Sequence, residues 1–444
     1  MKIARMGAVW LLVSAVALAH SGSGFFTGLE QHPSLKAAAA RLEGARLEAV
    51  NSANYLTIDA SGGFVSRELA PADPCPFLSD PDPSNDVFCQ ILNPDIPETT
   101  SQSELALVLR AFPYGDVADR QKTAMLNYEL ARIDFAQSRS RLEKAALEAA
   151  LQLKLAEDSY SLASEGLELA KQVLKATEIR YQKGAASERE LRQARLSLEE
   201  AEVNLQNAAE SRDLARLSLL SFTNSPPPPW PWPDLQPPAD AIPPDVQKAL
   251  VNQEMARVGL AHSKRSFLPV GEIRYQHNVS DNSAVGVSVE SRTLSARVYY
   301  GYQSYADPTR SRTENELRLG LRLNITQDAW GGYEAAQARL QAADRALEAA
   351  RKQAELELAR LEMQIEQSRR LVALKKSALG SARADYEETS KRVEIGLSAP
   401  IEEQRAWLSY SRAQLELTKA EQDVVRAELN LLAYLGIPPS EVWK

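Results

Sequence analysis

Alternating apolar and polar positions mark four short segments of the chain. From Glu316 to Ile325 the odd positions are leucine or isoleucine, and the even positions are charged, polar or glycine. Residues 272–279 and 56–64 alternate similarly, and residues 105–109 alternate less cleanly. This period of two predicts strands with one apolar and one polar face. Such strands suit either a transmembrane β-barrel with a wet lumen or one half-buried face of a soluble sandwich.

Two long windows without proline separate these segments. Residues 114–225 and 309–399 contain no proline, and residues 117–182 and 332–394 within them are rich in strong helix formers. A helix of either length would span roughly 90–100 Å, which exceeds the width of a globular core. We therefore expect the long helices to pack side by side as coiled coils, with their many alanines allowing close approach.

A glycine ends each long helix. Gly184 and Gly396 interrupt the helical pattern, and Ser187 and Ser398 follow as candidate N-caps for two returning helices. Two shorter helices each open with a proline. The expected short and returning helices are 33–53, 188–222, 244–265 and 400–436.

The chain is an internal duplication. Pro33 and its neighbours recur at Pro244 with an offset of 211 residues, and Gly184 recurs at Gly396 with an offset of 212. A shared proline start and a shared glycine break at one near-constant offset indicate duplication rather than similar composition. The predicted organisation is a signal peptide at 1–19, a first repeat at 28–224, a connector at 225–243 and a second repeat at 244–437.

Proline dominates the segment between the repeats. Residues 225–244 hold ten of the 24 prolines in the chain. This composition forms neither a helix nor a central strand, so we expect an extended connector. The connector is either an ordinary linker or a belt packed around the helices.

The N-terminus is typical of a secretory signal peptide. Lys2 and Arg5 give a basic start, and 13 apolar residues run from Gly7 to Ala19, where small residues offer a cleavage site. A helix needs about 20 residues to span a bilayer, so a retained anchor is the alternative reading of this stretch. We expect the protein to leave the cytoplasm.

The two cysteines lie in one loop-like stretch. Cys75 and Cys89 are the only cysteines, and proline, aspartate and serine surround them. Neither has a histidine or second cysteine at metal-ligand spacing. In an oxidising compartment we expect a disulfide that staples this loop, with two free thiols as the alternative.

Composition excludes several functional classes. The 51 basic and 59 acidic residues give a net charge of −8, which argues against nucleic-acid binding. A mean hydropathy of −0.33 excludes a polytopic helical membrane protein. The four histidines are scattered, and the sequence has no phosphate-binding glycine loop and no nucleophile elbow. We therefore expect no catalytic residue, no metal site, no cofactor and no enzymatic activity.

The strands are too few to close a barrel from one chain. Four clear segments, even with an extra strand-like stretch at 285–304, fall short of the eight strands of the smallest membrane barrels. Open sheet edges cannot stand in lipid, because their backbone groups find no partners there. If the strands span a membrane, copies of the chain must assemble into a closed ring.

The extra stretch at 285–304 has two readings. It either extends the barrel strands outward or folds as an extracellular hairpin. Four tyrosines in and after it are candidates for an interfacial aromatic belt or for one face of that hairpin. They are Tyr299, Tyr300, Tyr302 and Tyr305.

These features together resemble the outer membrane efflux protein family, the TolC-like channels, over about residues 28–437. The residues behind the resemblance are Pro33, Pro244, Phe267-Leu268-Pro269 before a strand, and the segment from Val393 to Ser398. The resemblance implies a mainly α-helical fold with membrane β-strands, built from duplicated strand and helical-hairpin units. It implies a homotrimer with four strands per chain, which share one β-barrel in the outer membrane above a long α-helical barrel in the periplasm. It further implies a passive exit duct that works with a periplasmic adaptor protein and an inner-membrane pump.

The resemblance also assigns the glycine turns to contacts with the adaptor. The residues implied are Gly396, Leu397 and Ser398 in the second turn and Gly184, Ala185, Ala186 and Ser187 in the first. The first turn departs from the Gly-Leu-Ser/Thr pattern of the family, which puts its adaptor role in doubt.

Acidic residues after these glycines narrow the tube entrance in related channels. Six positions on, this chain has Glu190 and Glu402, whereas nine positions on it has Gln193 and Arg405, so a second acidic ring is missing. A ring of carboxylates in a narrow pore favours cations. Arg405 is placed to pair with Glu402 one helical turn away. The alternative is that both glutamates are solvated helix-surface residues.

Three functions compete on this sequence: a trimeric export duct, a coiled-coil envelope spacer anchored by its strands, and a periplasmic adaptor subunit. Duplication of the whole unit disfavours the adaptor, in which one hairpin is inserted between flanking β domains. Two matched glycine turns favour the duct over the spacer, because a spacer needs no such pair. We expect the protein in the outer membrane, with a helical tube extending into the periplasm.

Overall fold

The computed structural model describes residues 24–52, 55–66, 99–110, 114–280, 282–304, 314–323 and 326–443. These residues form two compact units. The helical unit comprises the residues up to Leu42, Ala131–Ala249 and those from Glu348 onward, and the sheet unit comprises Glu43–Leu130 and Leu250–Leu347. The predicted signal peptide, Cys75, Cys89 and Tyr305 lie outside the described residues.

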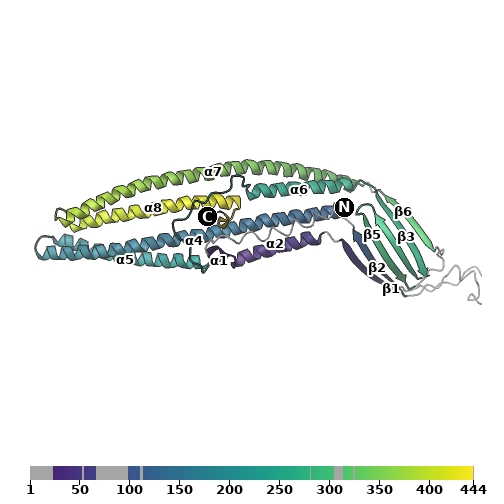
Figure 1. Cartoon of the computed structure of the whole chain (residues 1–444), viewed down its shortest axis with the longest axis horizontal. Helices are drawn as coiled ribbons and strands as arrows, with labels where there is room; N and C mark the ends of the chain where they lie inside the picture. The colour runs from purple at the N-terminus through teal and green to yellow at the C-terminus, as the bar shows by residue number, and fades with distance from the viewer. Residues whose placement is uncertain are drawn as a thin grey trace, which may run out of the picture. The chain divides into compact units, whose positions relative to one another are not determined.

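Helices make up most of the described chain (Figure 1). They are α1 (Gly24–Leu29), α2 (Pro33–Asn51), α4 (Asp116–Gln182), α5 (Glu188–Leu220), α6 (Pro244–Arg265), α7 (Gln327–Glu394), α8 (Pro400–Leu435) and α9 (Pro439–Val442). The six helices expected from the sequence are thereby confirmed, and α1 and α9 are additional. The long helices α4 and α7 contain 67 and 68 residues. Within the described residues, no helix combines the length and the apolar character needed to cross a bilayer.

A large hydrophobic core packs much of the helical unit together. Its fully buried side chains include Leu147 and Leu151 of α4, Leu429 and Leu432 of α8, and Phe25 of α1. At about 25 cal/mol per Å² of apolar surface removed from water, each such leucine stabilises the fold by roughly 2 kcal/mol. This burial explains why α4 and α8 stay paired although most of their remaining surface is polar.

The proline-rich connector packs against this core. Leu235 is 1% exposed, and its backbone N–H donates to Glu428 Oε2 at 3.3 Å. The Trp232 ring lies edge-on to Trp443 with centroids 5.3 Å apart. Of the two readings of the connector, the structure therefore supports the packed belt.

The described residues of the sheet unit form one antiparallel sheet. Its strands are β1 (Leu56–Ser66), β2 (Thr99–Arg110), β3 (Val270–Ser280), β4 (Ser283–Glu290), β5 (Ser295–Gln303) and β6 (Asn315–Arg322). Their order in the sheet is β1-β2-β5-β4-β3-β6 (Figure 1). The four strands expected from alternation are confirmed as β1, β2, β3 and β6.

The strand number differs from the family expectation. The resemblance implied four strands per chain, whereas the described residues form six. The extra stretch at 285–304 supplies both additional strands, as a β4–β5 hairpin between β2 and β3. Tyr299 alternates to the opposite sheet face from Tyr300 and Tyr302, so these three cannot form one belt.

Candidate functional site

The sheet has one polar and charged face. This face is lined by charged side chains from all six strands, together with serine, glutamine and asparagine side chains. Arg274 pairs with Glu272 at 2.9 Å, Arg297 of β5 pairs with Glu104 of β2, and Arg318 pairs with Glu316. Paired charges of both signs give a wet surface with little net field, which suits the lining of an aqueous passage.

The opposite face of the sheet is apolar and exposed. The strand registers align one row of side chains across all six strands. The row is Ile58, Leu107, Val298, Val287, Tyr275 and Leu317. These side chains are 40–68% exposed in the single chain. A contiguous apolar face of this kind marks contact with lipid or with another protein surface.

The first glycine turn is a left-handed helix end. Gly184 has φ +68°, and a Cβ at this position would meet no atom within 4 Å. The Gly184 N–H donates to Tyr181 O at 2.9 Å and the Ala185 N–H to Arg180 O at 2.8 Å. This pair of bonds satisfies carbonyls that the end of α4 would otherwise leave without partners. The sequence prediction of a glycine break is confirmed.

The second glycine turn has the same hydrogen-bond pattern. Gly396 has φ +77°, its N–H donates to Val393 O at 3.0 Å, and the Leu397 N–H donates to Arg392 O at 2.8 Å. Leu397 is 75% exposed and Ile395 is 69% exposed, so this turn presents an apolar tip. The two repeats therefore end their long helices with the same pair of backbone hydrogen bonds, and only the second turn adds large exposed apolar side chains.

The two returning helices start differently. Ser187 is the N-cap of α5, as expected, and its Oγ accepts the Glu190 N–H at 3.2 Å. The expectation for Ser398 is wrong. The N-cap of α8 is Ala399, which makes no side-chain cap bond, and Pro400 follows at the first helical position. Proline fixes a helical φ and removes one unpartnered N–H, so this start needs no serine.

Glu190 and Glu402 occupy matched positions but different environments. The Glu190 carboxylate accepts from the Ser187 backbone N–H at 2.5 Å and from Ser187 Oγ at 2.9 Å, which completes a capping box. Both hydrogen bonds lower the pKa of Glu190, and the bond from the Ser187 backbone N–H has the larger effect. Glu402 is exposed, and within the described chain no ion pair joins it to Arg405. The single chain does not make the pairing of Arg405 with Glu402, and that pairing stays a prediction.

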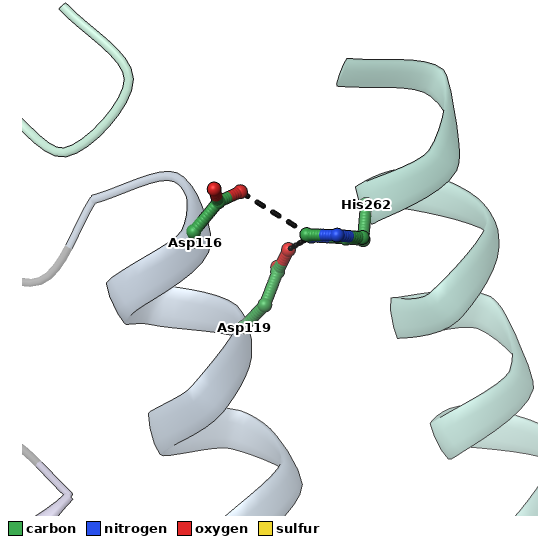
Figure 2. A group of neighbouring side chains, drawn as sticks. All are labelled: Asp116, Asp119 and His262. Carbon is green, nitrogen blue, oxygen red and sulfur yellow. Dashed lines mark ion pairs between the residues drawn. The ribbon is translucent and has the colours of Figure 1, made fainter. Parts of the chain in front are cut away.

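A compact charged cluster lies where α6 ends and α4 begins (Figure 2). His262 Nδ1 lies 3.2 Å from Asp116 Oδ1 and 3.4 Å from Asp119 Oδ2. Arg265 pairs with Asp119, and Arg292 Nε lies 3.5 Å from Asp116 Oδ2. Sequence reasoning missed this cluster, because more than 140 residues separate its histidine from its aspartates.

The cluster is best explained as a structural ion-pair network. Its three potential ligand atoms lie within 4.8 Å of one another, close enough for a metal ion. However, Arg265 and Arg292 already neutralise both aspartates. Acidic side chains in the first turn of α4 and basic ones in the last turn of α6 also complement the two helix dipoles. We therefore assign the cluster to fixing the helix ends beside the sheet.

Comparison with solved structures shows the fold. VceC, an outer membrane protein from Vibrio cholerae, superposes with a TM-score of 0.66 at 17% identity, over 93% of this chain and 95% of VceC. The CmeC outer membrane channel from Campylobacter jejuni superposes with a TM-score of 0.63 at 15% identity, over 93% of this chain and 84% of CmeC. The MtrE outer membrane channel from Neisseria gonorrhoeae superposes with a TM-score of 0.62 at 18% identity, over 93% of this chain and 88% of MtrE. No curated protein matches the sequence.

The sequence profile of the outer membrane efflux protein family matches the chain twice, over residues 27–225 and 243–437. Each match contains one helix–strand–long helix–returning helix series. Together they span most of the chain, and the fold agrees with that of TolC-like channels. The chain therefore belongs to the outer membrane efflux protein family and is an outer membrane protein.

Proposed function

We propose that three copies of this chain form the outer-membrane component of a tripartite export system, a passive duct from the periplasm to the exterior. The main support is the sheet, which has an exposed apolar face, a charged face and two edges, β1 and β6, without a strand partner among the described residues. Lipid gives unpaired backbone groups no partner. Closure by further copies satisfies both edges and places the charged face in the lumen.

The helices supply the periplasmic part of this duct. At about 1.5 Å per residue, α4 and α7 each measure about 100 Å. Helices of this length exceed the width of a single globular domain, and their largely polar surfaces would not be buried in one. Packed side by side as the wall of a tube, they would lead cargo to the barrel without any catalytic step.

The glycine turns are the proposed contact with the periplasmic adaptor. Ile395 and Leu397 give the second turn an exposed apolar tip, with Gly396 between them and Ser398 directly after them. The first turn, from Gly184 to Ser187, offers only small side chains. We assign the stronger adaptor contact to the second turn for this reason. The pump in the inner membrane would reach the duct through the adaptor.

Electron microscopy of the mature protein purified in detergent tests the duct. Threefold end views with a tube on the order of 100 Å long are expected. Solid rods without a lumen would favour the envelope spacer, and monomeric hairpins would favour the adaptor subunit. Either outcome would overturn the proposal.

Photo-crosslinking tests the adaptor contact. A photoreactive residue in place of Leu397 is expected to crosslink to a periplasmic protein that contains a helical hairpin. The control replaces Leu356 of α7, which is 69% exposed but lies far from the turn in sequence, and is expected to give at most a second copy of the chain. Identical products from both positions would contradict the assignment.

A further inference from the structure

The β4–β5 hairpin shares the apolar face of the other four strands. Val287 of β4 and Val298 of β5 stand in the middle of the six-strand apolar row, between Leu107 and Tyr275. The next row continues in the same way through Val289 and Ala296. A hairpin in water outside the membrane would have no reason to keep this alternation in register with its neighbours. The pattern indicates one continuous lipid-facing surface.

Contacts on the polar face fix the hairpin to both neighbouring strands. Arg297 of β5 pairs with Glu104 of β2. Tyr299 of β5 reaches across β4 and donates from its hydroxyl to Gln276 Oε1 of β3 at 3.1 Å. Gly286 of β4 makes room for this ring, because a Cβ there would lie 2.3 Å from Tyr299. The hairpin is therefore an integral part of the sheet wall.

The turn of the hairpin lies at the helix end of the sheet. Residues 291–294 connect β4 to β5. The Ser291 N–H donates to Gly271 O at 2.8 Å, at the start of β3, and Arg292 lies beside Asp116 at the start of α4. β4 begins at the other end of β3, where Ser283 pairs with Ser280. The chain therefore runs the whole height of the sheet down β4 and back up β5.

From these contacts we infer that the β4–β5 hairpin crosses the membrane, so that each subunit gives six strands and the trimer closes an 18-stranded barrel. The inference rests on the proposed trimer. The strands contain eight to twelve residues, close to the 9–11 that a tilted membrane strand requires. The four-residue turn lies on the helix side, which agrees with the short periplasmic turns of membrane barrels.

The additional strands widen the exit. Barrel diameter grows roughly linearly with strand number, so 18 strands give a barrel about half again as wide as 12. Strands spaced about 4.8 Å apart and tilted about 40° give a diameter of about 36 Å between backbones. Barrels of this size leave an open aqueous channel. Selection of cargo would then fall to the helical part of the duct.

Cryo-electron microscopy of the full-length mature trimer in detergent counts the strands directly. Eighteen strands, with residues 283–303 in the barrel wall, are expected. A threefold tube with a 12-stranded barrel and this hairpin outside the wall would overturn the inference and leave the export duct standing. The absence of threefold tubes would overturn both.

Two single substitutions test the lipid contact independently. Val287→Arg places a charge on the apolar face of β4, and we expect about tenfold or greater loss of assembled trimer from the outer membrane. Ser288→Glu is the control on the adjacent residue, which lines the polar surface between Arg274 and Arg297, and should leave trimer levels within about twofold. Equal tolerance of both substitutions would contradict a membrane-crossing hairpin.

Discussion

Ser187 follows Gly184 by three residues and Ser398 follows Gly396 by two, and only Ser187 caps a helix. In Ser187→Ala, Glu190 loses the hydroxyl that accepts its N–H, a loss that typically costs about 1 kcal/mol. We expect amide exchange in the first turn of α5 to accelerate about fivefold, measured by hydrogen–deuterium exchange. Ser398→Ala is the control and should leave α8 unchanged. A similar effect of both substitutions would show that the capping box contributes nothing at this turn.

Glu143 is a buried carboxylate whose titration should be visible in stability. Its side chain is 3% exposed and accepts from Arg139 at 2.8 Å and from the Ser440 N–H at 2.8 Å. Desolvation outweighs these bonds and raises the pKa of Glu143 above its ordinary value of 4.5. A raised carboxyl pKa means that the folded state binds the proton more tightly, so this contribution to stability is lost as pH rises from 4.5 through the folded pKa.

Thermal unfolding of Glu143→Gln tests this sign. We expect the melting temperature of the wild type, relative to that of the variant, to be lower at pH 7 than at pH 4. Glu348→Gln is the control of opposite sign, because the exposed Glu348 has its pKa lowered by Lys352. Its contribution is present above the unfolded pKa and is lost as pH falls. If the melting temperature of the wild type rises relative to that of Glu143→Gln as pH increases, the desolvation argument is contradicted.

At the scale of elements, the proline-rich connector acts as part of the helical core. Leu235 is 1% exposed among core side chains of α4 and α8, and Leu235→Ala should cost about 2–5 kcal/mol because it leaves a cavity. Ile242→Ala, in the same connector, changes a side chain that is 47% exposed and should cost less than about 0.5 kcal/mol. Thermal unfolding of both variants measures the difference. Equal melting temperatures would mean that the connector is an ordinary linker.

The sequence predicted the elements better than their partners. Proline-free windows and the glycines at 184 and 396 were enough to place α4, α7 and their ends, because helix geometry depends on local residues. The strand pairs were not predictable. Leu107 and Val298 are neighbours in the sheet although 191 residues separate them, and alternation shows only which face a residue takes.

The candidate site shows the same limit. Glu190 and Glu402 were equivalent by spacing, and only the structure shows that the first is engaged in a capping box. Ala399 is the N-cap of α8 in place of the expected Ser398, so the second repeat has no N-cap hydroxyl to bind Glu402. Contacts between side chains of one short turn depend on which residue begins the helix, and sequence places such boundaries only to within a few residues.

At the scale of the whole molecule, Glu402 is the stronger candidate for the proposed pore entrance, because its carboxylate is exposed whereas that of Glu190 is bound in a capping box. Three copies would bring three Glu402 carboxylates together, and like charges in a narrow pore attract cations and exclude anions. Glu190 is held by Ser187 and is therefore less able to turn toward a pore axis. The resemblance to related channels gave both residues this role, and the difference in their hydrogen bonds ranks them.

Reversal potentials of trimers in planar bilayers under a potassium chloride gradient test this ranking. Glu402→Gln is expected to reduce the ratio of potassium to chloride permeability several-fold, and Glu190→Gln less so. Glu394→Gln is the matched control, because Glu394 is an exposed glutamate two residues before Gly396 on the other arm of the same turn. If Glu402→Gln and Glu394→Gln change the reversal potential equally, or not at all, Glu402 is a solvated surface residue and the entrance lies elsewhere in the tube.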